Sequence, residues 1–360
     1  MPRPEGAVVG WDIGGAHVKA SWLQHGALVD VAQWACPLWQ GLEQLQRVLG
    51  LAAVRWPALH DAVHVVTMTG EMVDLFEHRE DGVRRIAALL AGSLPGVQFF
   101  AGDTGWCGAS DVHSHWDAIA SANWLATARH AADHCGRGVL VDIGSTTTDL
   151  IAFDAGRVST ASRSDADRLG SGELVYHGVV RTPLCAFSAR IGWRGAQLNV
   201  MNEFFATAAD VYRLTGELDP AHDLHPSADN APKDLPATRQ RLARMIGRDA
   251  RDASEDEWLD VAHAWRQAQV VEIGGQLARV LDALDRDDPG TVVSAGCGAF
   301  LVGDVVAAAR PGRRVPVVPY GARIARLSDR TVGDADALRA AAQVCAPCVA
   351  VATLFAREQR

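Results

Sequence analysis

The strongest constraint on the fold is a short motif that occurs twice, each time between two stretches typical of β-strands. The first copy, Asp-Ile-Gly-Gly-Ala-His-Val-Lys, runs from Asp12 to Lys19, and the second, Asp-Ile-Gly-Ser-Thr-Thr-Thr-Asp, runs from Asp142 to Asp149. An apolar run precedes each copy and an extended run follows it, which predicts two hairpins. Because the copies are a domain length apart, the repeat predicts two similar α/β lobes rather than a solenoid.

The remaining pattern predicts the same α/β class for both halves. In the first half we expect strands at 7–13, 18–23, 28–34, 62–68 and 97–101 and helices at 42–54, 82–91 and 115–134. In the second half we expect strands at 139–143, 148–153, 157–162, 291–294 and 315–318 and helices at 255–285 and 299–309.

These elements predict two duplicated actin-like (ribonuclease H-like) lobes with a central cleft. We expect lobe I at residues 1–135 and lobe II at 136–330, with an irregular insertion at about 163–251. Within the insertion, residues 219–236 are rich in Pro and Asp and predict a long loop or lid. Residues 331–360 should pack back on lobe I as a terminal helix, bent at Pro347.

Composition narrows the class of partner. A hydrophobic fraction of 48% with 21% charged residues is typical of a folded protein, and a net charge of −9 weighs against nucleic acid as a partner. The sequence contains neither an apolar leader nor a stretch of about 18 apolar residues, so we expect a cytoplasmic protein without membrane contact. Seven cysteines, an odd number, predict reduced thiols.

The two loops have the composition of a phosphate clamp. Gly14, Gly15 and Gly144 let the backbone approach phosphate oxygens, and hydroxyl groups and a lysine supply further donors. An aspartate at the end of each strand can hold Mg²⁺. Either loop alone could be an ordinary glycine turn, but the pair favours phosphate binding. The predicted metal ligands are Asp12 and Asp142, and the further phosphate contacts are Lys19, Ser145, Thr146 and Thr147.

A third glycine turn, with Gly296 and Gly298, follows a predicted strand and precedes a helix. It suits the approach of a flat ring or of another phosphate to a helix N-terminus. Tight packing of the strand on the helix explains the same residues equally well.

Three motifs resemble those of the actin, Hsp70 and sugar-kinase superfamily. They are Asp12-x-Gly14 with Lys19, Asp142-Ile-Gly144 with Thr147 and Asp149, and the turn from Gly296 to Gly298. More narrowly, the first motif and the stretches at 176–183 and 201–213 resemble the hydantoinase/oxoprolinase-like proteins of tetrahydromethanopterin-linked one-carbon metabolism.

The resemblance implies an enzyme of methanofuran biosynthesis. Such an enzyme joins a furan methyl diphosphate to the phenol of a glutamyltyramine or a tyrosine and releases diphosphate. It implies Mg²⁺ as cofactor and does not favour ATP, and it makes the chain a candidate homodimer. We expect Lys19 and Asp12 to serve the leaving diphosphate and Asp149, or else Asp103, to act as the base. Expected substrate contacts are Tyr176, Arg181, Asn202, Glu203, Gly296 and Gly298.

Other interpretations remain open. The same fold serves ATP-dependent kinases and hydantoinase or oxoprolinase hydrolases, and a non-catalytic nucleotide-binding protein would carry the same loops. Arg181 could instead be a surface ion-pair partner, and a solvated loop position explains Lys233 better than phosphate binding does. Cys345 and Cys348 have redox spacing, yet their apolar surroundings predict buried thiols.

Overall fold

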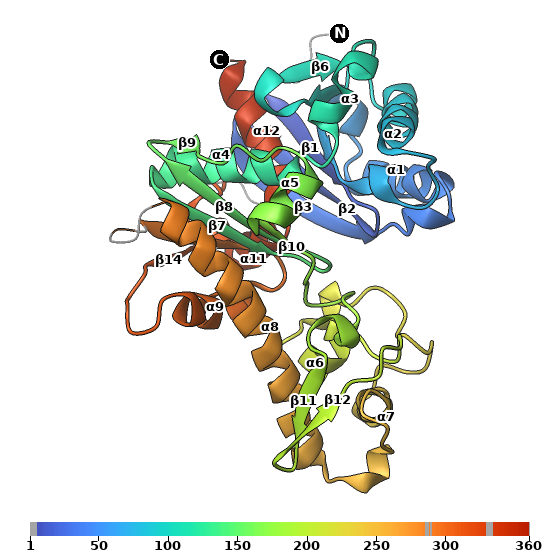
Figure 1. Ribbon diagram of the computed structural model, residues 1–360. Coiled ribbons are helices and arrows are strands. Elements are labelled where there is room, and N and C mark those ends of the chain that lie inside the picture. Colours follow the sequence, from blue (N-terminus) through green and yellow to red (C-terminus); the bar gives the residue numbers. More distant parts are fainter. Residues whose placement is uncertain (1–5, 285–287, 289, 329–333, 360) are drawn as a thin grey trace. The chain divides into compact units, whose positions relative to one another are not determined.

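Two β-sheets carry the two hairpins, one in each half of the chain. The computed structural model describes residues 6–284, 288, 290–328 and 334–359 (Figure 1). The first sheet has the order β3-β2-β1-β4-β5-β6. Its strands are β1 (Ala7–Ile13), β2 (His17–Gln24), β3 (Ala27–Ala35), β4 (Val63–Met68), β5 (Gln98–Phe100) and β6 (Trp106–Gly108).

The second sheet repeats this arrangement in the order β10-β8-β7-β13-β14, with β9 also paired to β8. Its strands are β7 (Gly138–Ile143), β8 (Thr148–Asp154), β9 (Arg157–Val158), β10 (Leu174–Val175), β13 (Thr291–Ala295) and β14 (Val317–Pro319). In both sheets, strands from later in the chain continue the sheet next to the first strand of the hairpin: β4, β5 and β6 beside β1, and β13 and β14 beside β7. The predicted α/β class and the predicted duplication are confirmed, although β9 covers only two of the six residues expected at 157–162.

The chain forms two compact units. Unit 1 consists of residues 1–138, 151–165 and 318–360, and unit 2 consists of residues 139–150 and 166–317. Unit 1 therefore includes 151–165 and 318–330, which were expected in lobe II. The end of β8 turns back through β9 onto the C-terminal part of α4 (Asn123–Cys135), where the Gly156 N–H donates to the Gly136 carbonyl. The predicted boundary at 330/331 lies outside the described residues.

Helices cover the first sheet because their apolar faces match its buried side chains. They are α1 (Glu43–Arg55), α2 (Arg79–Ser93), α3 (Val112–Ile119), α4, the short α10 (Tyr320–Arg323), α11 (Ala335–Val344) and α12 (Ala346–Glu358). Helix α12 packs directly on β1 and β2: the Ser21 hydroxyl donates to the Cys348 carbonyl, and a Cβ on Gly10 would come within 2.1 Å of that oxygen. As predicted, all seven cysteines are free thiols.

The C-terminal helix is bent as predicted, with Pro347 in the first turn of α12, where a proline needs no N–H partner. Among the described residues, no single helix is both long and apolar enough to cross a bilayer. The pair α11 and α12 meets those two conditions together but bends by 97° at its break.

The single helix expected at 115–134 is wrong, because the chain breaks it into α3 and α4 at Ser121. This residue has φ +51°, outside the helical region. Its hydroxyl lies 2.8 Å from Glu71 Oε1 and 3.0 Å from Asp165 Oδ2, and Arg79 contacts both carboxyl groups. Glu71 is 1% exposed, and its Oε2 has no hydrogen-bond partner among the described residues. A buried polar cluster therefore replaces the helical turn.

Unit 2 contains the insertion for which the sequence predicted only irregular structure, and the insertion has helices and a hairpin of its own. Its elements are α5 (Asp165–Ser171), whose first residue belongs to unit 1, the hairpin of β11 (Arg190–Trp193) and β12 (Ala196–Asn199), α6 (Ala208–Leu214) and α7 (Leu235–Arg244). The 30-residue helix α8 (Glu255–Leu284) packs on α6 and β11 near its start and on α9 (Val302–Ala309) further along (Figure 1).

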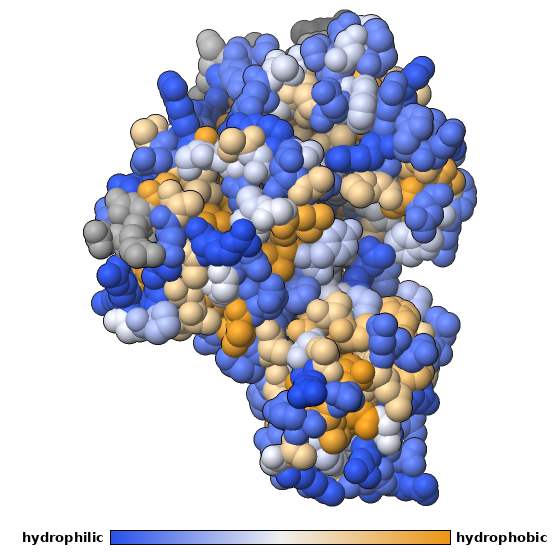
Figure 2. Space-filling model, in the orientation of Figure 1, coloured by the Kyte–Doolittle hydropathy of each residue, from blue (hydrophilic) through white to orange (hydrophobic). Residues whose placement is uncertain are grey.

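Ion pairs, rather than regular structure, fix the predicted loop at 219–236. Arg213 pairs with Asp210 and Asp223, and Lys233 donates to both the carboxylate and the carbonyl of Asp223. Arg241 and Asp210 form a fully buried pair beneath this loop. Lys233 is thus part of a structural network. Figure 2 shows apolar atoms on the surface of the same region, where Met201, Phe204, Leu224 and Leu235 are exposed.

Candidate phosphate-binding site

Each Asp-Ile-Gly hairpin closes with the same hydrogen bond. The Gly14 N–H donates to the His17 carbonyl at 3.0 Å, and the Gly144 N–H donates to the Thr147 carbonyl at 2.8 Å. In both turns a Cβ on the glycine would meet the carbonyl that accepts this bond, at 2.8 Å and 3.3 Å respectively. The repeat in the sequence is therefore also a repeat in backbone geometry.

In both loops, carbonyl oxygens accept hydrogen bonds from other segments of the chain. The carbonyls of Gly15 and Ala16 accept N–H groups from Leu38 and Cys36. The carbonyl of Gly144 accepts from Val179, and that of Ser145 accepts from Val180 and Arg181. A carbonyl oxygen repels phosphate, so a loop whose carbonyls are bound elsewhere is better suited to present N–H groups to an anion.

The stretch from Tyr176 to Pro183 forms a cradle for the second loop. A Cβ on Gly178 would lie 2.3 Å from the Thr146 nitrogen and 2.4 Å from the Ser145 carbonyl carbon, so no other residue fits there. The Thr182 hydroxyl accepts the Gly178 N–H, and the Thr148 hydroxyl donates to the His177 carbonyl. Gly178 and Thr182 of this stretch are therefore accounted for by packing and hydrogen bonding around the second loop.

The third glycine turn packs on the strand that leads into the same loop. Gly296 has φ +85°, and a Cβ on it would lie 2.1 Å from the Ile143 carbonyl and 2.5 Å from Asp142 Oδ1. A Cβ on Gly298 would meet the side chains of Ile143 and Val179 at 2.4 Å and 2.7 Å. Close packing therefore accounts for both glycines, and a role in substrate binding stays a prediction.

Asp12 and Lys19 lie directly opposite each other on β1 and β2, so their side chains share a face of the sheet. Asp12 is 5% exposed, while Lys19 is half-buried and donates to the Val344 carbonyl at 3.1 Å. This bond places the ammonium group at the end of α11, where the helix dipole favours a positive charge.

Asp149 takes the place of Lys19 in the second hairpin. One of its oxygens, Oδ1, forms an ion pair with Arg168, whose side chain is 2% exposed. The pair fixes the direction of the carboxylate. The two hairpins therefore present opposite charges at equivalent positions.

The two predicted metal ligands lie in different units, Asp12 in unit 1 and Asp142 in unit 2. Among the described residues, no group of three or more His, Cys, Asp or Glu side chains is arranged to hold a metal. Asp12 is buried and Asp142 half-buried, each at the end of a strand beside a glycine loop. Mg²⁺ commonly uses only one or two carboxylates and takes its remaining ligands from phosphates and water. Each aspartate, taken by itself, has the donor chemistry for a Mg²⁺ ion that arrives with a phosphate ligand, and a metal role for either stays a prediction.

Arg181 lies beside the second loop through its backbone bond to Ser145. Burial lowers the pKa of Arg181 from its ordinary value, while Tyr176 acts in the opposite direction. Burial also lowers the pKa of His225 to about 4, reinforced by the charges of Arg181 and Lys233. A neutral imidazole and two cations therefore gather in this part of unit 2, and Tyr176, which is 59% exposed, is accessible to a ligand.

Asn202 and Glu203 lie before a helix rather than within one. Both are exposed, and α6 begins only at Ala208, after a capping box between Thr207 and Asp210. The hydroxyl and carboxylate of this box satisfy N–H groups that would otherwise lack partners at the helix start. A role of Asn202 and Glu203 in substrate binding stays a prediction.

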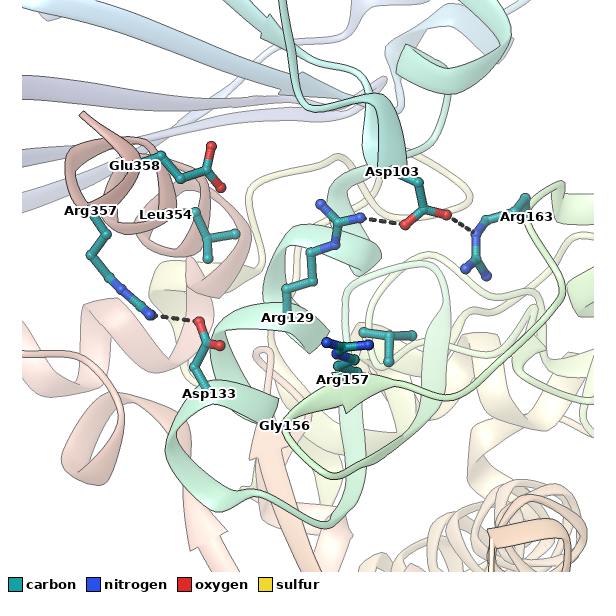
Figure 3. A pocket seen from close by; sticks show the side chains of 10 residues that line it. Asp103, Arg129, Asp133, Gly156, Arg157, Arg163, Leu354, Arg357 and Glu358 are labelled. Carbon is teal, nitrogen blue, oxygen red and sulfur yellow. Dashed lines mark hydrogen bonds and ion pairs between the residues drawn. The ribbon is translucent and has the colours of Figure 1, made fainter. Parts of the chain in front are cut away.

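Asp103 follows β5 on the same edge of the first sheet as Asp12, because β1, β4 and β5 are parallel. Two strands of separation correspond to roughly 10 Å. Figure 3 shows Asp103 between Arg129 and Arg163, with which it forms ion pairs. Partial burial tends to raise the pKa of Asp103, but the hydrogen bonds and charges of Arg163 and Arg129 outweigh it and lower that pKa. Both oxygens of Asp103 are therefore engaged by arginine, Oδ1 by Arg129 and Oδ2 by Arg163.

Sequence reasoning missed three residues of the site. Arg168 lies in a stretch described as irregular, and Gly178 and His225 were not singled out. A glycine at the centre of a β-branched stretch, as in His-Gly-Val-Val, was the available signal for Gly178. Neither Arg168 nor His225 lies in a pattern that would have distinguished it.

Comparisons with known proteins identify the family of this chain. The profile of the family described as Hydantoinase/oxoprolinase matches residues 62–321. A synthase of Methanocaldococcus jannaschii, named (4-{4-[2-(gamma-L-glutamylamino)ethyl]phenoxymethyl}furan-2-yl)methanamine synthase, is 30% identical over 264 residues, covering 71% of this chain and 76% of its own.

The solved structures that this chain is similar to are more distant in sequence. A nucleotide-free acetone carboxylase, from a study of ATP-dependent acetone carboxylation, is 12% identical with a TM-score of 0.56 and covers 95% of this chain and 70% of its own. A glucokinase from Streptomyces griseus in complex with glucose and AMPPNP is 13% identical with a TM-score of 0.48, covering 97% and 99%. The acetone carboxylase supports the actin-like fold class.

Proposed function

Because the chain belongs to the hydantoinase/oxoprolinase family, we propose that it is a transferase that forms the aryl–alkyl ether of a methanofuran-type cofactor. The observation that carries the proposal is its similarity to the Methanocaldococcus jannaschii synthase, whose name describes a phenoxymethyl furan. The proposed substrates are an aminomethylfuran diphosphate and the phenol of tyramine, a glutamyltyramine or tyrosine.

In the proposed reaction, the phenolic oxygen attacks the methylene carbon of the furan. The bond from that carbon to diphosphate breaks, and its electron pair leaves with the diphosphate. The phenolic proton passes to a base. The charge that develops on the leaving group needs donors that are already in place before the reaction.

The second hairpin has the features that such a leaving group requires. Its carbonyls are bound internally, and its three hydroxyl residues, Ser145, Thr146 and Thr147, are partly exposed. In the first hairpin Lys19 adds a positive charge opposite Asp12. Mg²⁺, if bound at the carboxylate of Asp12 or of Asp142, would neutralise further charge on the diphosphate.

For the base we propose Asp149. Arg168 binds its Oδ1 and orients the carboxylate. The phenol has a pKa near about 10, so a fixed carboxylate helps by taking the proton as the new bond forms. Arg181, with Tyr176 beside it, would contact the acceptor.

A second candidate is an ATP-dependent reaction, favoured by the fold shared with the acetone carboxylase. Incubating the full chain and Mg²⁺ with the furan diphosphate and each phenol, and separately with ATP and each phenol, distinguishes the two. Ether product and diphosphate without ATP are expected. ADP formation that depends on a phenol, with no ether from the diphosphate, would overturn the transferase proposal.

A further inference from the structure

Unit 1 contains a cavity rich in charged residues, away from its Asp-Ile-Gly hairpin. The cavity has a volume of about 510 Å³, which is within the usual range for small-molecule sites. The ends of two helices, the β8–β9 turn and the segment after β5 form its walls (Figure 3). Lys19 bonds to Val344 just before α12, whereas Arg357 and Glu358 of the cavity end that helix, roughly 20 Å further along its axis.

An aromatic cluster packs against the charged residues that line the cavity. Arg129 lies 5.4 Å from the centre of the Phe100 ring, which packs on Trp106, which in turn packs edge-on against Phe355. The Trp106 indole N–H donates to Glu358 Oε2 and so holds that carboxylate at the rim. Leu354 and Val158 supply apolar lining.

The charges in the cavity do not balance. Asp103 serves both Arg129 and Arg163, which leaves one positive charge in excess, while Arg357 and Asp133 balance each other. The Arg157 side chain forms no ion pair or hydrogen bond with the described residues, so it contributes a second positive charge. Glu358, bonded only to an uncharged indole, contributes one negative charge.

A complementary ligand therefore carries two negative charges and one positive charge. We propose that this cavity binds a free acidic α-amino acid such as glutamate. One carboxylate pairs with Arg157, the second with the guanidinium groups around Asp103, and the ammonium group with Glu358. Charge-assisted hydrogen bonds of this kind are the strong ones in a partly exposed site. Leu354 and Val158 accommodate the methylene groups.

Isothermal titration calorimetry on the full chain tests the assignment with four probes: L-glutamate, L-glutamine, glutarate and γ-glutamyltyramine. Glutamate should bind, and glutamine, which lacks one carboxylate, should bind roughly 10-fold more weakly or worse. Arg157→Gln should weaken glutamate binding by a similar factor. Glu358→Gln should weaken glutamate binding but leave glutarate, which has no ammonium group, unaffected.

Arg251→Gln provides the matched control, because Arg251 is a solvated arginine of unit 2 with 86% side-chain exposure. It should bind glutamate as the unaltered chain does. Absence of glutamate binding, or equal binding by the Arg157 variant, would overturn the proposal. Preference for γ-glutamyltyramine over glutamate would overturn the free amino acid as ligand. Because these titrations contain no diphosphate, their outcome is independent of the proposed ether synthesis.

Discussion

Gly178 allows a direct test of how the second phosphate loop is held. In Gly178→Ala the new Cβ would lie 2.3, 2.4 and 2.6 Å from three backbone atoms of Ser145 and Thr146. Ordinary contacts begin near 3.4 Å, so the loop must shift by about 1 Å. Overpacking of this size typically costs about 1–3 kcal/mol of unfolding free energy.

The same shift should harm ligand binding and turnover more than stability. A displacement of about 1 Å in positioned groups can reduce a rate by roughly 100-fold. Urea unfolding measures the loss of stability. Calorimetric titration of diphosphate in the presence of Mg²⁺ measures the loss of binding, and an assay of turnover measures the loss of rate.

Gly275→Ala is the matched control, because Gly275 lies within α8 and a Cβ there meets nothing within 4 Å. It should stabilise the protein by about 0.5–1 kcal/mol, as alanine does in a helix interior, and leave diphosphate binding unchanged. If Gly178→Ala matches the unaltered chain in stability, diphosphate affinity and turnover, the cradle argument is refuted.

Three further predictions concern buried charges. Arg168→Leu should lower the free energy of unfolding in urea by about 3 kcal/mol, because it removes the arginine that pairs with the Asp149 carboxylate. The double variant Arg168→Leu with Asp149→Leu should lose less unfolding free energy than the sum of the two single variants. Asp149→Asn should abolish ether formation while diphosphate still binds in calorimetry; a full rate would exclude Asp149 as the base. Burial raises the pKa of Glu71 above its ordinary value, so the folded protein should lose stability as pH rises from about 5 through that raised pKa. Glu71→Gln removes this loss, and its advantage in unfolding free energy over the unaltered chain should grow between about pH 5 and pH 8; an advantage that does not change with pH would exclude a buried, protonated Glu71.

Most of the sheet framework could be predicted because its signals are local. The strand at 7–13 was predicted to the residue, and the bend at Pro347 follows from proline geometry. The break at Ser121 could not be predicted, since it depends on Glu71 and Asp165, which are distant in the sequence. The elements between β10 and α8 were missed for a similar reason: ion pairs such as Arg241–Asp210 stabilise them, and such pairs leave no periodic pattern.

The site was predictable only in its backbone. Glycines and hydroxyl residues in a repeated loop identify the hairpins. Close approach of the backbone to a phosphate group requires these residue types within the loop itself. Partners of the charged side chains were not visible: Asp149 is bound to Arg168, and Asp103 to Arg129 and Arg163. Each of these pairs is formed by tertiary packing.

Helix α8 links movement at α9 to movement of the insertion within unit 2. Its 30 residues form a rod of about 45 Å, with Trp258 and Trp265 buried near one end and Leu277 and Leu281 buried near the other. Gly274 lies between them, so close to Ala308 that a Cβ would approach within 2.8 Å. A tilt of α8 by roughly 5° about this contact would move the outer end by about 2.5 Å, since some 20 residues, or about 30 Å, lie beyond it. Small changes in packing at α9 are therefore amplified at the insertion.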